Sequence, residues 1–260
     1  MSNQRIDIVD LSHWNAGPVG WKAMLHAGVK AVYHKATEGA GYVDPKFVGR
    51  RRGAREAGMP FGAYHFARPA ASSGTAQARH FLRVAGVRPG DPRPMLDLED
   101  RGGKNAAQLT AWVSEFVAEV RRQLGCPPFL YTRFNLTHTL DCPLWVARYS
   151  NSNAAPKVPS PWKVWTGWQF SNGQYGRPNY VAGAGHADLT TLNSADPRGL
   201  LRKLRVPNPH TKPAPKPKPK PKPKPEPEPP APKAPTERQT LAALRRLLRR
   251  LLGLDRKGTK

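Results

Sequence analysis

Apolar and polar residues follow two different patterns in the first 206 residues of the chain. Short runs rich in β-branched and aromatic residues predict buried strands, whereas apolar residues that recur every three or four positions predict amphipathic helices. The predicted strands cover 6–11, 30–35, 61–66, 95–98, 129–131, 144–147, 163–170 and 187–191. The clearest predicted helix covers 105–124, and shorter helical patterns cover 20–27, 45–57 and 75–84.

About eight strands with helices between the early ones predict an α/β fold, specifically an irregular β/α barrel with fewer helices than strands. The alternative is a doubly wound open sheet with helices on both faces. No glycine-rich phosphate loop follows the first predicted strand. The barrel is therefore the preferred prediction.

Proline divides the chain. Of its 29 prolines, 14 fall between Pro207 and Pro235, where they alternate first with lysine and then with glutamate. Such a segment cannot form a core, so it predicts a disordered, extended linker. The predicted domains are a barrel over 1–206, a Lys/Pro-rich linker over 207–235 and a tail over 236–260.

The tail has the pattern of one cationic amphipathic helix. Thr236 and Gln239 fit a capping box at its start. Its apolar side would carry Leu241, Leu244, Leu247, Leu248, Leu251, Leu252 and Leu254, and the opposite side Arg245, Arg246, Arg249 and Arg250. Three interpretations remain open: binding to an anionic wall polymer or membrane surface, self-association, and docking back onto the barrel.

The charge balance indicates an anionic partner. The chain has 42 Lys and Arg against 18 Asp and Glu, a net charge of +24, and the predicted barrel is itself basic. No nucleic-acid reader motif is recognisable, so we expect no specific nucleic-acid partner. The N-terminal segment lacks a Sec signal pattern, which predicts a protein made in the cytoplasm. Cys126 and Cys142 are too few for a disulfide framework, and we expect free thiols.

Acidic residues at the ends of two predicted strands are the candidate chemistry. The segment Met95–Asp100 ends an apolar strand in Asp97 and Glu99, which share one face with about 6–7 Å between their Cα atoms. This separation overlaps the carboxyl–carboxyl distances of acid-catalysed glycoside cleavage, and a solvated strand end or a metal site are the alternatives. Asp10 ends the first strand. In a barrel, it would meet Asp97 and Glu99 at one mouth.

Eight segments occur in an order that resembles a known family. They are IVDLSHWN, YHKATEG, GAYHF, MLDLED, FLYTR, LWVARY, GWQFS and HADLT, and they span about residues 6–193. Their order resembles glycoside hydrolase family 25, the N-acetylmuramidases of the Chalaropsis-lysozyme type, which are common among phage endolysins. The chain departs from the family pattern at Ile8, where glycine is frequent, and at Thr190, where asparagine is frequent.

The resemblance implies a substrate and catalytic residues. The substrate would be the β-1,4 bond between N-acetylmuramic acid and N-acetylglucosamine in the glycan strands of peptidoglycan. The catalytic residues would be Asp97, Glu99 as the general acid, Asp10 and Asp188. We expect no cofactor and no metal, because His13 and His65 lack metal-ligand spacing.

Aromatic residues near predicted strand ends are candidate platforms for sugar rings. They are Tyr64, Tyr131, Trp145, Tyr149 and Trp168, with Gln169 as a polar partner, whereas Trp112 and Phe116 fit helix packing. Lys35 and Glu38 fit a structural ion pair better than a catalytic one.

The expected mechanism needs a protonated Glu99. Partial burial and the charges of Asp97 and Asp10 would raise its pKa. A carboxylate nucleophile and assistance from the N-acetyl group of the substrate both remain open, and both predict net retention. The expected biological role is that of a phage endolysin that reaches the wall through a holin-type hole, and the alternatives are a bacterial autolysin or a non-catalytic wall-binding protein.

Overall fold

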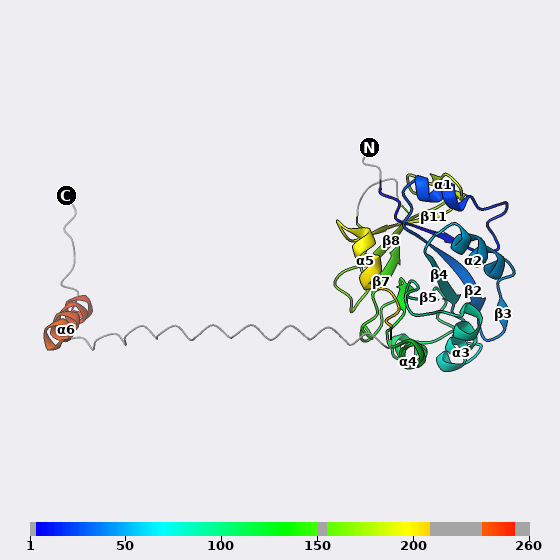
Figure 1. Ribbon diagram of the computed structural model, residues 1–260. Helices are drawn as coiled ribbons and strands as arrows, with labels where there is room; N and C mark the ends of the chain where they lie inside the picture. The colour runs from blue at the N-terminus through cyan, green and yellow to red at the C-terminus, as the bar shows by residue number, and fades with distance from the viewer. Residues whose placement is uncertain (1–3, 150–154, 209–235, 253–260) are drawn as a thin grey trace. The chain divides into compact units, whose positions relative to one another are not determined.

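Eight strands form a closed barrel in the computed structural model, which describes residues 4–149, 155–208 and 236–252 (Figure 1). Seven of them run parallel to one another, and the last is antiparallel to the two strands beside it. In chain order they are β1 (Ile8–Leu11), β2 (Ala31–Glu38), β4 (Phe61–Phe66), β5 (Met95–Leu98), β6 (Phe129–Thr132), β7 (Leu144–Ala147), β8 (Gly167–Asn172) and β11 (Asp188–Leu192). This architecture confirms the prediction of an irregular β/α barrel.

Four helices follow the early strands and pack on the outside of the barrel. They are α1 (Trp21–His26), α2 (Phe47–Glu56), α3 (Gly74–Ala85) and α4 (Ala106–Leu124). The start of α4 is fixed by Asn105, whose side chain accepts from the backbone N–H of Gln108 at 2.9 Å while the Gln108 side chain accepts from the N–H of Asn105 at 3.1 Å. The predicted helix over 105–124 is thus confirmed.

The alternation of side chains along each strand separates two cores. Val9, Val32 and Leu96 point outward into the layer between the strands and the helices. A second core lies inside the barrel and consists of Ile8, Ala31, Tyr33, Met95, Phe129, Tyr131, Trp145 and Leu192. Because inward positions alternate with outward ones, the strand sequence decides which side chains can reach the barrel mouth.

Two glycines make room for the large aromatic residues inside. A Cβ atom on Gly62 would lie 2.5 Å from the Tyr33 ring, and one on Gly167 would lie 2.5 Å from the Trp145 ring. Tyr33 and Trp145 are fully buried, and their rings meet edge to face with centroids 5.5 Å apart. Together with Phe129 they form the floor of the barrel interior, a term used below for these three residues.

Four short elements were not predicted. They are β3 (Tyr42–Val43), β9 (Tyr180–Val181), β10 (Gly185–His186) and α5 (Pro197–Lys203). Strands of two residues have no readable alternation, and α5 is only two turns long. Asp196 caps α5 by accepting from the backbone N–H of Gly199 at 2.9 Å.

The chain divides into two compact units, Met1–Lys212 and Pro213–Lys260. The second contains α6 (Glu237–Leu251), where the tail helix is predicted. The linker expected over 207–235 lies outside the described residues from 209 onward, as does Leu254. None of the helices in the described part of the chain has both the length and the apolar character needed to cross a membrane.

Candidate active site

A pocket of about 230 Å³ opens at the carboxyl ends of the parallel strands. All four acidic residues singled out in the sequence line it, as do Tyr64, Tyr131, Tyr149 and Gln169. The wall is completed by residues that the sequence analysis did not assign to the site: Ser12, Trp14, Lys35, Phe66 and Met95. Active sites of barrels with parallel strands lie at this end.

Strand register brings the acidic residues together. Asp10 on β1 lies directly opposite Asp188 on β11, and both face inward. Asp97 on β5 is in register with Phe66 on β4 and Tyr131 on β6. Glu99 shares the inward face of Asp97 two residues later, where the chain leaves the strand, so it lies exposed at the rim while Asp97 is buried.

Burial is the largest cause of a raised pKa at every one of these carboxyl groups. The pKa of Asp188 is raised to about 7, with the charge of Glu99 adding to burial. The pKa of Asp10 is raised by burial and by Asp188, against a hydrogen bond from Thr190. Four carboxyl groups so close together in a low dielectric do not all ionise near neutral pH, so the pocket retains protons.

Asp97 and Glu99 titrate as a pair. Burial raises the pKa of Asp97, and the negative charge of Glu99 raises it further. Burial also raises the pKa of Glu99, whereas Arg133, a hydrogen bond with Asp97 and Lys35 lower it. The expectation that burial raises the pKa of Glu99 is confirmed, and the hydrogen bond between the two carboxyl groups means that the pair shares a proton.

Two buried carboxylate oxygens have no hydrogen-bond partner among the described residues. They are Oδ1 of Asp10 and Oδ1 of Asp97, and both residues line the pocket. An unsatisfied buried oxygen is costly in a folded protein. Both oxygens are therefore available to accept hydrogen bonds from a molecule that enters the pocket.

Tyrosine hydroxyl groups also line the pocket. The hydroxyl of Tyr131 donates to Oε1 of Gln169 at 2.7 Å, and that of Tyr149 donates to the same oxygen at 3.1 Å. Burial raises the pKa of Tyr149 to about 12 and that of Tyr131 above its usual range, so both stay protonated. Tyr64 is held neutral by burial and by Asp97, Asp10 and Asp188.

A family model described as glycosyl hydrolases family 25 matches residues 9–177, more than half of the chain. The chain belongs to glycosyl hydrolase family 25. The matched segment contains three of the four carboxyl residues of the pocket, and Asp188 follows it.

Individual proteins and solved structures that are similar to this chain agree with this family assignment. Lysozyme M1 of Streptomyces globisporus is 36% identical over 181 residues, which cover 63% of this chain and 60% of that protein. An N,O-diacetylmuramidase of Chalaropsis sp. is 34% identical over 196 residues, which cover 64% of this chain and 89% of that protein. The crystal structure of a bacterial lysozyme from Streptomyces coelicolor superimposes with a TM-score of 0.68 at 33% identity, over 77% of this chain and 97% of that one. The chain thus spans about three fifths of the length of Lysozyme M1.

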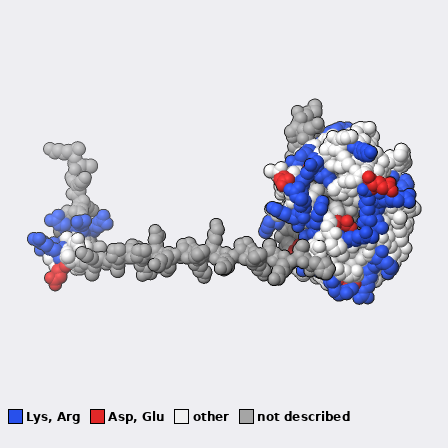
Figure 2. All heavy atoms as spheres, viewed as in Figure 1, with Lys and Arg blue, Asp and Glu red and all other residues white. Residues whose placement is uncertain are grey.

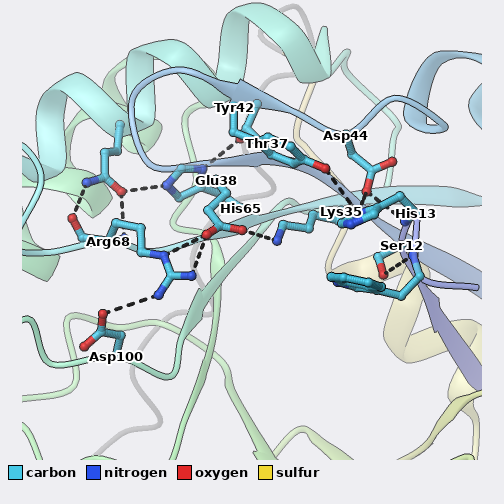
Figure 3. A network of polar contacts seen from close by, with 12 residues as sticks. Ser12, His13, Lys35, Thr37, Glu38, Tyr42, Asp44, His65, Arg68 and Asp100 are labelled. Atoms are coloured by element: carbon cyan, nitrogen blue, oxygen red, sulfur yellow. Dashed lines mark hydrogen bonds and ion pairs between the residues drawn. The ribbon is translucent and has the colours of Figure 1, made fainter.

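A network of ion pairs borders the pocket of this family 25 chain (Figure 3). Lys35 pairs with Glu38, as the sequence predicted, and Arg68 reaches Glu38 at 2.6 Å and Asp100 at 3.5 Å. Lys35 also faces the pocket, where its charge lowers the pKa of Asp97 and of Glu99. Lys35 therefore links this network of ion pairs electrostatically to Asp97 and Glu99.

Trp14 is the most exposed aromatic residue of the pocket wall, with 82% of its surface accessible. Its ring lies against His13, with centroids 4.6 Å apart, and His13 contacts Asp44 at 3.0 Å and the Tyr42 hydroxyl at 3.2 Å (Figure 3). Trp14 belongs to the IVDLSHWN segment, so its position four residues after the strand-end acid Asp10 was the available signal.

Two of the predicted sugar platforms of the family 25 site are wrong. Trp145 points inward but is fully buried in the floor, where its Nε1 donates to Oγ1 of Thr190 at 3.2 Å. Trp168 lies on an outward position of β8, is 4% exposed, and donates from Nε1 to the carbonyl of Arg148 at 3.0 Å. Neither ring lines the pocket.

The remaining candidates from the sequence have structural partners. His65 is buried between Thr37 and Gln77, at 2.8 and 2.9 Å. Cys126 and Cys142 are free and buried, and burial raises the pKa of Cys142 to about 12. No cluster of His, Cys, Asp and Glu that could hold a metal occurs within the described ranges.

Proposed function

We propose that this chain is an N-acetylmuramidase, which hydrolyses the β-1,4 bond between N-acetylmuramic acid and N-acetylglucosamine in peptidoglycan. The observation that carries the proposal is the group of four carboxyl residues at one barrel mouth, all with raised pKa values. Family membership and the names of the Streptomyces and Chalaropsis relatives support it.

Glu99 is the proposed general acid. It is the member of the acidic pair at the rim, where the oxygen of a scissile bond can reach it. Asp97 lies beneath it and shares its proton. As Glu99 protonates the leaving sugar oxygen, positive charge develops on the neighbouring ring, and the carboxylates of Asp97 and Asp10 stabilise that charge. Hydrolysis with net retention of configuration is the expected outcome.

The other pocket residues are proposed to hold the glycan. The free oxygens of Asp10 and Asp97 accept from sugar hydroxyl or amide groups. Tyr64 and Tyr131 present rings and hydroxyl groups toward the cavity, and Trp14 offers an exposed face on which an apolar sugar face can stack. Such platforms position a substrate before the chemical step.

The test is digestion of purified peptidoglycan, with mass spectrometry of the fragments before and after borohydride reduction. The proposal predicts reduced muramic acid ends from the wild-type chain and none from Glu99→Gln. The matched control is Glu56→Gln, which makes the same change at a carboxylate that is 70% exposed in α2. Reduced glucosamine ends would instead indicate a glucosaminidase, and near-wild-type digestion by Glu99→Gln would remove this residue as the acid.

We also infer that the biological role is host lysis by a phage endolysin. The support is the order of sequence segments, which resembles a family common among phage endolysins. The test is cytoplasmic expression in a bacterium whose purified wall the chain digests, followed by addition of a pore-forming agent. Rapid lysis only after pore formation supports the endolysin role, whereas lysis without it favours an autolysin that reaches the wall by another route.

A further inference from the structure

The helix α6 has no buried residue along its length of 15 residues. Its start is closed by Thr236, whose backbone N–H donates to Oε1 of Gln239 at 3.0 Å. The helix belongs to the second compact unit of the chain. The start of the helix is therefore stabilised by local contacts. Its exposed side chains can only act by binding a partner molecule.

One face of α6 is made of leucine. The six leucines lie within roughly 140° of one another around the helix axis. Each has between 53% and 78% of its surface exposed: Leu241, Leu244, Leu247, Leu248, Leu251 and Leu252. Burying a leucine side chain is worth about 1.5–3 kcal/mol, so this face has a strong tendency to leave water.

The remaining surface of α6 is cationic. It carries Arg238, Arg245, Arg246, Arg249 and Arg250, all exposed, whereas Glu237 at the first turn is the one acidic residue among its described positions. Figure 2 shows blue basic side chains next to white surface on this helix. A partner must therefore offer an apolar phase and negative charge side by side.

We propose that α6 lies in the surface of an anionic lipid bilayer, with its leucine face in the boundary between headgroups and acyl chains. A helix of this length spans about 22 Å, which is shorter than the roughly 30 Å hydrocarbon core, so it lies along the surface. The arginines then pair with lipid phosphates. This inference is independent of the muramidase proposal, because it uses no residue of the barrel.

Two other partners fit the helix less well. An anionic wall polymer would satisfy the arginines but has no apolar phase for six leucines. Self-association would bury leucines, but about two heptads are short for a coiled coil, and a face this wide exceeds the seam of a two-stranded one. Of these three partners, the lipid surface satisfies both halves of α6 at once.

The experiment is co-sedimentation of the full chain with vesicles of phosphatidylglycerol and phosphatidylcholine, compared with vesicles of phosphatidylcholine alone. We expect strong binding only to the anionic vesicles. The decisive variant is Leu244→Gln with Leu248→Gln on the leucine face, which we expect to bind roughly 100-fold more weakly. The matched control is Ala242→Gln with Ala243→Gln on the other side, with an expected change below about threefold.

Because neither double variant changes the charge, attraction between the basic barrel and the vesicles stays the same in all three proteins. Cleavage of soluble glycan by each variant verifies an intact barrel and tests the muramidase proposal separately. Equal binding by the leucine-face variant would overturn the lipid inference, as would binding to isolated walls but not to vesicles. Concentration-dependent oligomers without lipid, abolished by the same variant, would assign the leucine face to self-association instead.

Discussion

Replacing Asp188 by asparagine should stabilise the fold at neutral and alkaline pH. The pKa of this carboxyl is raised from 3.8 to about 7, chiefly by burial and then by the charge of Glu99. The folded state therefore keeps the proton to a higher pH than the unfolded chain does. The proton on Asp188 therefore adds to the free energy of unfolding. This stabilisation is complete below about pH 4 and is lost as the pH rises toward about 7.

The size of the effect follows from the same shift. Ionising Asp188 in the fold corresponds to a cost of at most about 4 kcal/mol. The side chain retains some solvent access, and the neighbouring carboxyl groups take up part of the proton, so about 2 kcal/mol is the expected gain for Asp188→Asn above pH 7. Removing this charge also lowers the pKa of Asp10, which Asp188 raises.

Urea unfolding of both proteins at steps from about pH 5 to about pH 8 measures this gain. The free energy of unfolding of the wild type should fall relative to that of the variant across this range. Asp141→Asn is the control, because Asp141 is 85% exposed in an ion pair with Arg121 and its replacement should change the pH dependence by less than about 0.5 kcal/mol. Parallel curves for wild type and Asp188→Asn would refute the assignment of a raised pKa to this residue.

Three further substitutions separate binding from packing. Trp14→Ala should raise KM for soluble glycan about tenfold at nearly constant kcat, with unfolding changed by less than about 0.5 kcal/mol; an unchanged KM would exclude Trp14 as a platform. Trp145→Phe should cost about 2 kcal/mol in urea unfolding, because it leaves a cavity and removes the donor to Thr190. An unchanged urea midpoint of unfolding would contradict the position of Trp145 in the floor. Tyr131→Phe removes the hydrogen bond to Gln169 and should lower kcat/KM about tenfold at a stability cost of about 1 kcal/mol; steady-state kinetics identical to the wild type would argue against this contact.

The barrel was predictable because its strands carry strong local signals. Runs such as Leu144–Ala147 are apolar throughout, as is typical of strands buried on both faces, and each barrel strand was predicted within a few residues of its observed bounds. The helical spacing of apolar residues over 105–124 located α4. These are features of neighbouring residues, which a sequence displays directly.

The position of each aromatic ring depends on strand register, which the sequence does not display. Trp168 lies one residue before Gln169, and alternation places the two side chains on opposite faces of β8. Trp145 faces inward and is in register with Tyr131, but it is fully buried and does not line the pocket. Its depth depends on Gly167, whose missing side chain leaves space for the indole. Proximity to a family segment therefore identified the strands correctly but misplaced two of the five candidate platforms, Trp145 and Trp168.

The floor of the barrel also sets the chemistry above it. Its three aromatic residues exclude water beneath the four carboxyl groups, and burial is accordingly the largest cause of each raised pKa. One chain of hydrogen bonds joins the floor to the site: Trp145 donates to Thr190, and a hydrogen bond from Thr190 lowers the pKa of Asp10. The Thr190 hydroxyl thus offsets part of the effect of burial on the pKa of Asp10. Stability of the floor and ionisation of the proposed catalytic group are thus linked through a single side chain.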